Sequence, residues 1–86
     1  MGLDSVELII RFEESLGITI PNSAAERLQT PANVIDFAMN ELQRHGHAPM
    51  RYHVAEIVRL VTIDQIGINP EQYRENARFI EDFGID

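Results

Sequence analysis

The residues best suited to a chemical role lie at the start of the chain, in the run Gly2-Leu3-Asp4-Ser5-Val6. Ser5 carries a hydroxyl group directly after an aspartate, at the point where an apolar periodicity begins and a helix is expected to start. The unpaired amide groups and the dipole of a helix start favour an anionic group near Ser5. The simpler interpretation is that Asp4 or Ser5 only caps the helix.

Other residue types that could do chemistry are scarce. The chain has no cysteine, which excludes disulfides, thiolate metal sites and a cysteine nucleophile, and which fits a reducing, cytoplasmic setting. His45, His47 and His53 come without cysteines or clustered carboxylates and make a poor metal ligand set, so we interpret them as linker histidines and expect no metal. Unlike Ser5, neither Ser15 nor Ser23 is preceded by Gly-x-Asp. We expect Ser15 to be a surface residue and Ser23 to cap a helix.

A small helical domain has to position these residues, since 86 residues with 44% hydrophobic content form one domain with a modest core. A first helix is predicted from Asp4 or Ser5 to about Leu16, with Gly17 as its stop. Its apolar stripe at helical spacing predicts an inward face made of Val6, Ile9, Ile10, Phe12 and Leu16.

Two further long helices follow from the same spacing. Thr30-Pro31 reads as a cap and first turn of a helix that ends near Arg44, after a possible short helix over 23–28. A helix over about 52–66 ends at Gly67, and Asn69-Pro70 starts one more helical turn. The inward residues are predicted to be Val34, Ile35, Ala38, Met39, Leu42, Val54, Ile57, Val58, Val61 and Ile66. No segment has a convincing strand period, so the predicted class is all-α, a small bundle of four helices.

The rest of the chain, 74–86, is predicted to be a loop anchored by Ala77, Phe79, Ile80 and Phe83.

The formal net charge of −7 argues against nucleic-acid binding and favours partners with basic surfaces. No apolar run approaches the roughly 20 residues of a membrane span, and no signal peptide is visible. We therefore expect a cytoplasmic protein without a membrane or nucleic-acid partner.

The chain resembles the acyl carrier protein family, with the family's two parts in exchanged order. Residues after the linker resemble its first part, through Gly67-Ile68-Asn69-Pro70-Glu71 and Phe79-Ile80-Glu81-Asp82-Phe83-Gly84-Ile85-Asp86. Residues before it resemble the second part, through Leu3-Asp4-Ser5-Val6-Glu7-Leu8 and Gly17-Ile18-Thr19-Ile20-Pro21. The resemblance implies a circularly permuted carrier domain over 1–86, in which 1–44 is the second part, 45–51 a linker and 52–86 the first part.

The resemblance also implies a function. A serine in the family carries covalent 4′-phosphopantetheine, whose thiol holds an acyl or aminoacyl group for fatty-acid, polyketide or related pathways. Catalysis belongs to partners, a phosphopantetheinyl transferase and acyl-transfer or synthase enzymes with basic docking patches, so the chain itself is not expected to be an enzyme. The attachment candidate is Ser5, preceded by Asp4, and the acidic docking residues are Glu7, Glu13 and Glu14. Ile10, Met39 and Ile57 are more simply core residues than the lining of an acyl cavity.

Two registers compete for the attachment position. The local pattern places it at Ser5, whereas alignment backwards from Pro21 places it at Gly2, with Asp86 before it. Glycine has no hydroxyl group, and Ser5 would then come about one helical turn too late. The alternatives are therefore a carrier modified on Ser5, an unmodified interaction module that has lost its serine, and an engineered or truncated chain whose parent has that serine.

The exchanged order also leaves two arrangements open. The tail can meet the head within one chain, because residues 45–51 can bridge about 20 Å at roughly 3.3 Å per extended residue. In a swapped dimer, the tail of one chain would meet the head of another. We expect the monomer.

Overall fold

The computed structural model describes residues 3–85, and their regular secondary structure is entirely helical. The α-helices are α1 (Leu3–Leu16), α2 (Asn22–Ala25), α3 (Pro31–Arg44) and α4 (Arg51–Ile66), followed by a 3₁₀ turn at Pro70–Gln72. The predicted all-α class is thus confirmed for this part of the chain. No helix within it is long and apolar enough to cross a membrane.

Local signals set the helix boundaries. The Thr30 hydroxyl accepts the Asn33 N–H at 3.1 Å, the Asn33 side chain accepts the Thr30 N–H at 3.2 Å, and Pro31 begins α3. Gly17 and Gly67 follow α1 and α4 with φ of 68° and 80°, a left-handed conformation that ends a helix with little strain in glycine. These boundaries agree with the sequence prediction.

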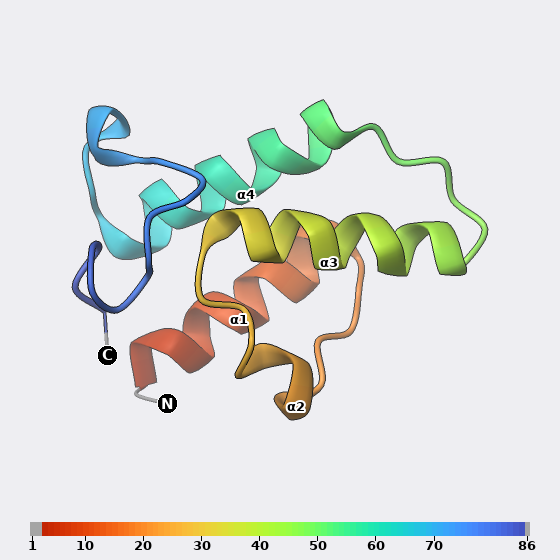
Figure 1. Cartoon of the computed structure of the whole chain (residues 1–86), viewed down its shortest axis with the longest axis horizontal. Helices are drawn as coiled ribbons and strands as arrows, with labels where there is room; N and C mark the ends of the chain where they lie inside the picture. The colour runs from red at the N-terminus through yellow and green to blue at the C-terminus, as the bar shows by residue number, and fades with distance from the viewer. Residues whose placement is uncertain (1–2, 86) are drawn as a thin grey trace.

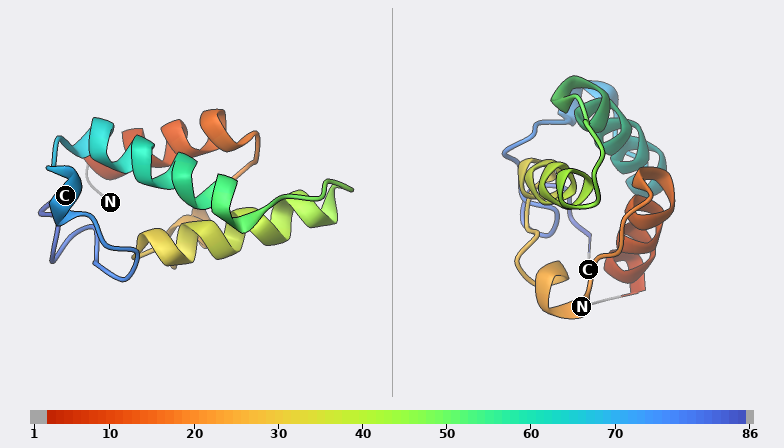
Figure 2. Two further views of the ribbon diagram at one scale, coloured as in Figure 1. Left: turned by 90° about the horizontal axis from the view of Figure 1, so that it is seen from above. Right: turned by 90° about the vertical axis from the view of Figure 1, so that its right-hand side faces the viewer.

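The three long helices enclose one core, with α4 packed on both α1 and α3 (Figure 1). The short α2 lies beside α1 and α3 on the side away from α4 (Figure 2). The start of α1 and the last described residues lie at one end of the molecule, whereas the α3–α4 connection lies at the other (Figure 1). The fold thereby brings the two extremes of the described chain to the same end.

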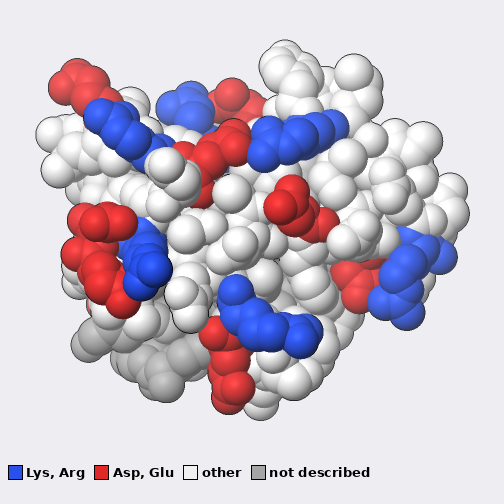
Figure 3. Space-filling model, viewed as in Figure 1, with Lys and Arg blue, Asp and Glu red and all other residues white. Residues whose placement is uncertain are grey.

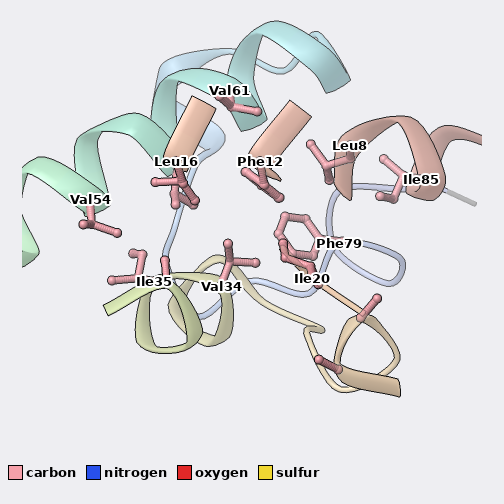
Figure 4. Packing of buried hydrophobic residues seen from close by; sticks show 14 residues of the cluster. Leu8, Phe12, Leu16, Ile20, Val34, Ile35, Val54, Val61, Phe79 and Ile85 are labelled. Carbon is pink, nitrogen blue, oxygen red and sulfur yellow. The ribbon is translucent and has the colours of Figure 1, made fainter. Parts of the chain in front are cut away.

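The buried apolar residues form a single cluster that draws on every helix and on the tail (Figure 4). Its members are Leu8, Phe12, Leu16, Ile20, Ala24, Ala25, Val34, Ile35, Ala38, Val54, Val58, Val61, Phe79 and Ile85. All ten predicted inward residues of α3 and α4 are in this cluster or partly buried against it.

The predicted inward face of α1 is wrong in part. Val6 and Ile10 are exposed, and Leu8 is buried instead. The buried stripe runs through Ser5, Leu8, Phe12 and Leu16, a helical spacing rotated away from Val6 and Ile10. Because Leu8, Ile9 and Ile10 are consecutive apolar residues, the sequence alone does not fix the phase of this face.

The tail after α4 folds back over the bundle. The radius of gyration is 12.0 Å, close to the roughly 12 Å expected for a folded domain of this length, so the tail does not extend into solvent. Glu75 holds the middle of the tail in place. Its backbone carbonyl accepts the Ala32 N–H at 2.8 Å, and its carboxylate accepts a hydrogen bond from Arg51 Nη2 at 2.8 Å. The predicted anchor Phe79 is buried, but Ile80 is 58% exposed, and Ile85 is the anchor that the sequence prediction missed.

Candidate functional site

Ser5 lies inside α1 rather than before it. Helix α1 already includes Leu3, so Asp4 and Ser5 occupy its first turn, and the predicted start at Asp4 or Ser5 is too late. Asp4 is exposed, whereas Ser5 is only 8% exposed and belongs to the inward stripe of the helix. The candidate hydroxyl therefore faces the protein interior at the end of the molecule where the tail arrives.

A cavity of about 230 Å³ opens beside Ser5. Three segments build its wall: the first turns of α1, the end of α2 with the loop after it, and the tail. Its lining residues are Ser5, Leu8, Ile9, Ala25, Glu26, Leu28, Gln29, Phe79, Ile80, Glu81 and Ile85. Most of them are apolar, so the cavity suits an apolar group with a polar rim at Glu26, Gln29 and Glu81.

The tail also reaches the exposed side of this helix start. Asp4, Gln65 and Ile66 share a smaller pocket of about 170 Å³ with Phe83, Gly84 and Ile85. Ile85 thus lines both pockets, and its side chain lies beside Leu8 of α1 (Figure 4). Gly2 and Asp86, on which the alternative register rests, lie outside the described residues.

The structure places Ile10, Met39 and Ile57 away from this cavity. Ile10 is exposed on α1, and Met39 and Ile57 pack partly buried against the core. None of the three is among the residues that line the cavity beside Ser5. Sequence periodicity could not locate this cavity, since its wall combines α1 with a tail that has no helical period.

The three candidate acidic residues of α1 have different surroundings. Glu7 and Glu14 are exposed, and Glu7 Oε2 lies 3.4 Å from Gln65 Nε2. Glu13 is half-buried and accepts the Ile20 N–H at 2.7 Å. The structure therefore gives Glu13 a role in holding the connector after α1, whereas Glu7 and Glu14 remain accessible to a partner.

Basic residues interrupt the acidic surface. Arg11 donates to Asp64 Oδ2 at 2.8 Å and to Gln65 Oε1 at 3.0 Å, which places a guanidinium between Glu7 and Glu14 along α1. Acidic and basic side chains are intermixed on the face in Figure 3. This face therefore does not present one continuous acidic field.

The Glu13 contact predicts a stability effect. Glu13→Ala leaves the Ile20 N–H without its charged acceptor, and we expect the free energy of unfolding to fall by about 1–2 kcal/mol. Glu14→Ala, next to it and exposed, should change the free energy by less than about 0.5 kcal/mol. Urea unfolding followed by circular dichroism measures both. Equal effects of the two substitutions would contradict the stabilising role of the hydrogen bond between Glu13 and Ile20.

The histidines do not assemble into a metal site. His45 Nε2 lies 3.8 Å from Glu41 Oε2, and His45 and His47 line a pocket with Glu41 at the end of α3. Within residues 3–85, no three or more histidine, aspartate or glutamate side chains gather closely enough to hold a metal ion.

Tyr73 lies in the tail with its ring stacked on Phe83, at 6.3 Å between centroids and 9° between planes. Its hydroxyl oxygen is buried without a hydrogen-bond partner among the described residues. Burial, reinforced by the charge of Glu75, raises the pKa of Tyr73 from 10.0 to about 12. The folded tail therefore favours the neutral phenol.

The raised pKa predicts a pH dependence of stability. The folded state keeps the Tyr73 proton between pH 10 and about 12, where the unfolded chain loses it, so stability should fall as the pH rises through that range. Tyr73→Phe has no proton to lose and should show a smaller alkaline fall. Thermal unfolding at a series of pH values measures the difference. Identical alkaline profiles of the two proteins would contradict it.

Comparison with known proteins gives a similarity over part of the chain. No protein-family model and no solved structure matches the chain. Over 41 residues it is 50% identical to an acyl carrier protein of Thermosynechococcus vestitus (strain NIES-2133 / IAM M-273 / BP-1). The match covers 48% of this chain and 51% of that protein, so the chain spans about half the length of this curated relative. Together with the helical fold, this partial similarity supports the acyl carrier protein family.

Proposed function

We propose that this chain is a carrier domain that holds acyl or aminoacyl groups as thioesters on a 4′-phosphopantetheine arm attached to Ser5. The observation that carries the proposal is the place of Ser5, in the first turn of α1 and in the wall of a largely apolar cavity. The partial similarity to an acyl carrier protein supports the same role. Such a domain supplies tethering and high local concentration, and partner enzymes supply the catalysis.

The residues around Ser5 fit a phosphopantetheine arm, provided that the Ser5 hydroxyl becomes exposed. The amide groups of the first turn of a 14-residue helix favour a phosphate ester on Ser5 Oγ, and the neighbouring cavity suits an apolar acyl group. In the attachment step, Ser5 Oγ bonds to the pantetheine-side phosphorus of the diphosphate in coenzyme A, and the phosphoanhydride bond breaks. The nucleotide half leaves as adenosine 3′,5′-bisphosphate, and the hydroxyl proton passes to a base of the transferase. The condition is exposure, because a hydroxyl on an 8% exposed residue has to be uncovered first.

We propose further that the two parts of the family fold occur here in exchanged order within one chain. The wall of the cavity supports this, since it includes residues 5–9 and 79–85 from opposite extremes of the described chain. Residues 45–50 connect α3 to α4 at the other end of the molecule (Figure 1). A monomer in dilute solution, measured by light scattering, is the expected result. A dimer that dissociates only on unfolding would favour tail exchange between chains.

The burial of Ser5 favours a second candidate function, an unmodified interaction module that keeps the carrier fold. One experiment separates the two. The protein is incubated with coenzyme A and a broad-specificity phosphopantetheinyl transferase and is then weighed by mass spectrometry. A gain of one phosphopantetheine that is lost in Ser5→Ala and kept in Ser15→Ala supports the carrier. No gain, where a known carrier is modified, supports the unmodified module.

Partners of the proposed carrier are the transferase and synthase or acyl-transfer enzymes with basic docking patches. The net charge of −7 and the exposed Glu7 and Glu14 support this choice, because opposite charge speeds encounter. Glu7→Gln with Glu14→Gln should slow association with the transferase several-fold at low salt, and the difference should shrink in high salt. The matched control is Glu71→Gln, an exposed residue of the 3₁₀ turn. Equal slowing in the control would remove α1 from the proposed docking surface.

A further inference from the structure

We infer that residues 78–85 form a lid over Ser5, which has to lift before the Ser5 side chain can be reached from solvent. The inference concerns access to the site of the proposed function and rests on that function for its biological meaning. Ser5 is only 8% exposed, whereas the other two serines of the chain, Ser15 and Ser23, are exposed. Access to Ser5 therefore differs from access to an ordinary surface serine.

The lid covers Ser5 through its two ends. Phe79 and Ile85, which are 5% and 8% exposed, both line the cavity beside Ser5. Ile85 also lines the second pocket with Asp4, so it faces the start of α1 across two pockets. Figure 4 shows Ile85 beside Leu8, the next residue of the inward stripe.

Internal hydrogen bonds make the lid one unit. The N–H groups of Asp82 and Phe83 donate to Arg78 O at 2.9 and 3.0 Å, and the Arg78 N–H donates to Asp82 Oδ2 at 2.7 Å. The Gly84 N–H donates to Ile80 O and the Ile85 N–H to Phe79 O, both at 3.1 Å. All five bonds close within the segment, so they can persist while the segment moves as a body.

A backbone hydrogen bond joins the lid to the bundle near its start. The Phe79 N–H donates to Gln29 O at 2.9 Å. The tail just before the lid is fixed at Glu75 by Ala32 and Arg51. Between these points lie the exposed Asn76 and the half-buried Ala77. The lid can therefore pivot there, while the apolar contacts of Phe79 and Ile85 oppose its opening.

Thiol labelling tests the lid without any transferase. The natural chain has no cysteine, so Ser5→Cys and Ser15→Cys each give one reactive site on the same helix. A helix start favours the reactive thiolate, which by itself would make position 5 the faster of the two. Because of the lid, we expect position 5 to react with a maleimide at least about tenfold more slowly than position 15 in native buffer, and equally fast in urea.

Second substitutions identify what covers Ser5. In the Ser5→Cys background, Ile85→Ala should raise the labelling rate several-fold. Arg78→Ala, at an exposed residue of the same lid that does not line the cavity, should leave the rate unchanged. Val54→Ala, buried in α4, controls for general destabilisation. Equal rates at positions 5 and 15 in native buffer overturn the lid. An effect of Ile85→Ala no larger than that of Val54→Ala also overturns it.

The transferase assay then separates the lid from the proposed function. Faster phosphopantetheine attachment in Ile85→Ala than in the natural chain supports both. If attachment never occurs while labelling follows the expected pattern, the proposed function fails and the lid is supported. If attachment occurs while position 5 labels as fast as position 15, the proposed function is supported and the lid is overturned.

Discussion

Phe79→Ala should lower the free energy of unfolding by about 3–5 kcal/mol, the usual cost of truncating a buried phenylalanine. Phe79 is 5% exposed, and its ring centroid lies 6.1 Å from those of both Phe12 and Phe83. A small domain has roughly 5–15 kcal/mol of stability in total, so the loss would be large. Urea unfolding monitored by circular dichroism measures it.

The neighbouring residue supplies the control for this prediction. Ile80 is 58% exposed, and Ile80→Ala should change the free energy of unfolding by no more than about 0.5 kcal/mol. If Phe79→Ala were as mild as Ile80→Ala, the tail would not be part of the core.

Phe12→Ala should have an effect of similar size, about 3–5 kcal/mol, because the Phe12 side chain, on the inward face of α1, is fully buried. Its control is Ile10→Ala, an exposed residue of the same helix that should cost less than about 0.5 kcal/mol. A large loss in Ile10→Ala would restore the inward face predicted from the sequence, and would contradict the observed rotation of α1.

The milder pair Phe12→Leu and Phe79→Leu keeps the fold intact for a double-mutant cycle. The rings are tilted by 48° at 6.1 Å, a geometry for which coupling of about 0.5–1.5 kcal/mol is expected. Strict additivity of the two substitutions would mean that α1 and the tail do not touch in solution.

The elements that the sequence predicted well are those with local causes. Thr30 and Pro31 begin α3 through contacts within one turn, and Gly17 and Gly67 end helices by their own backbone freedom. The all-α class follows from apolar spacing over many residues, which is a strong signal even where single boundaries are displaced by a residue or two.

The errors arose where distant segments decide the structure. Val6 and Ile10 were predicted to be buried, yet packing against α4 and the tail selected the stripe through Ser5, Leu8 and Phe12. In the tail, Ile80 and Ile85 are equally apolar, and only the turn between them determines which one is buried.

The candidate site was predicted in outline but not in its surroundings. The sequence placed Ser5 near the start of a helix and the tail near it, through motifs at the two ends of the chain. It did not predict that Ser5 faces inward, nor that Glu13 binds the backbone of the connector. Both features depend on the phase of α1, which only the assembled bundle fixes.

The central claim is that the tail and the start of α1 of one chain form a single site. Ile9 and Glu81 line the same cavity from these two segments, and the natural chain offers no competing cysteine. The most direct measurement is cross-linking of the double variant Ile9→Cys, Glu81→Cys with a short bis-maleimide in dilute solution, read by mass spectrometry after proteolysis. We predict a rapid link within one chain, and a link found only between chains, or none in the folded protein, would contradict the claim.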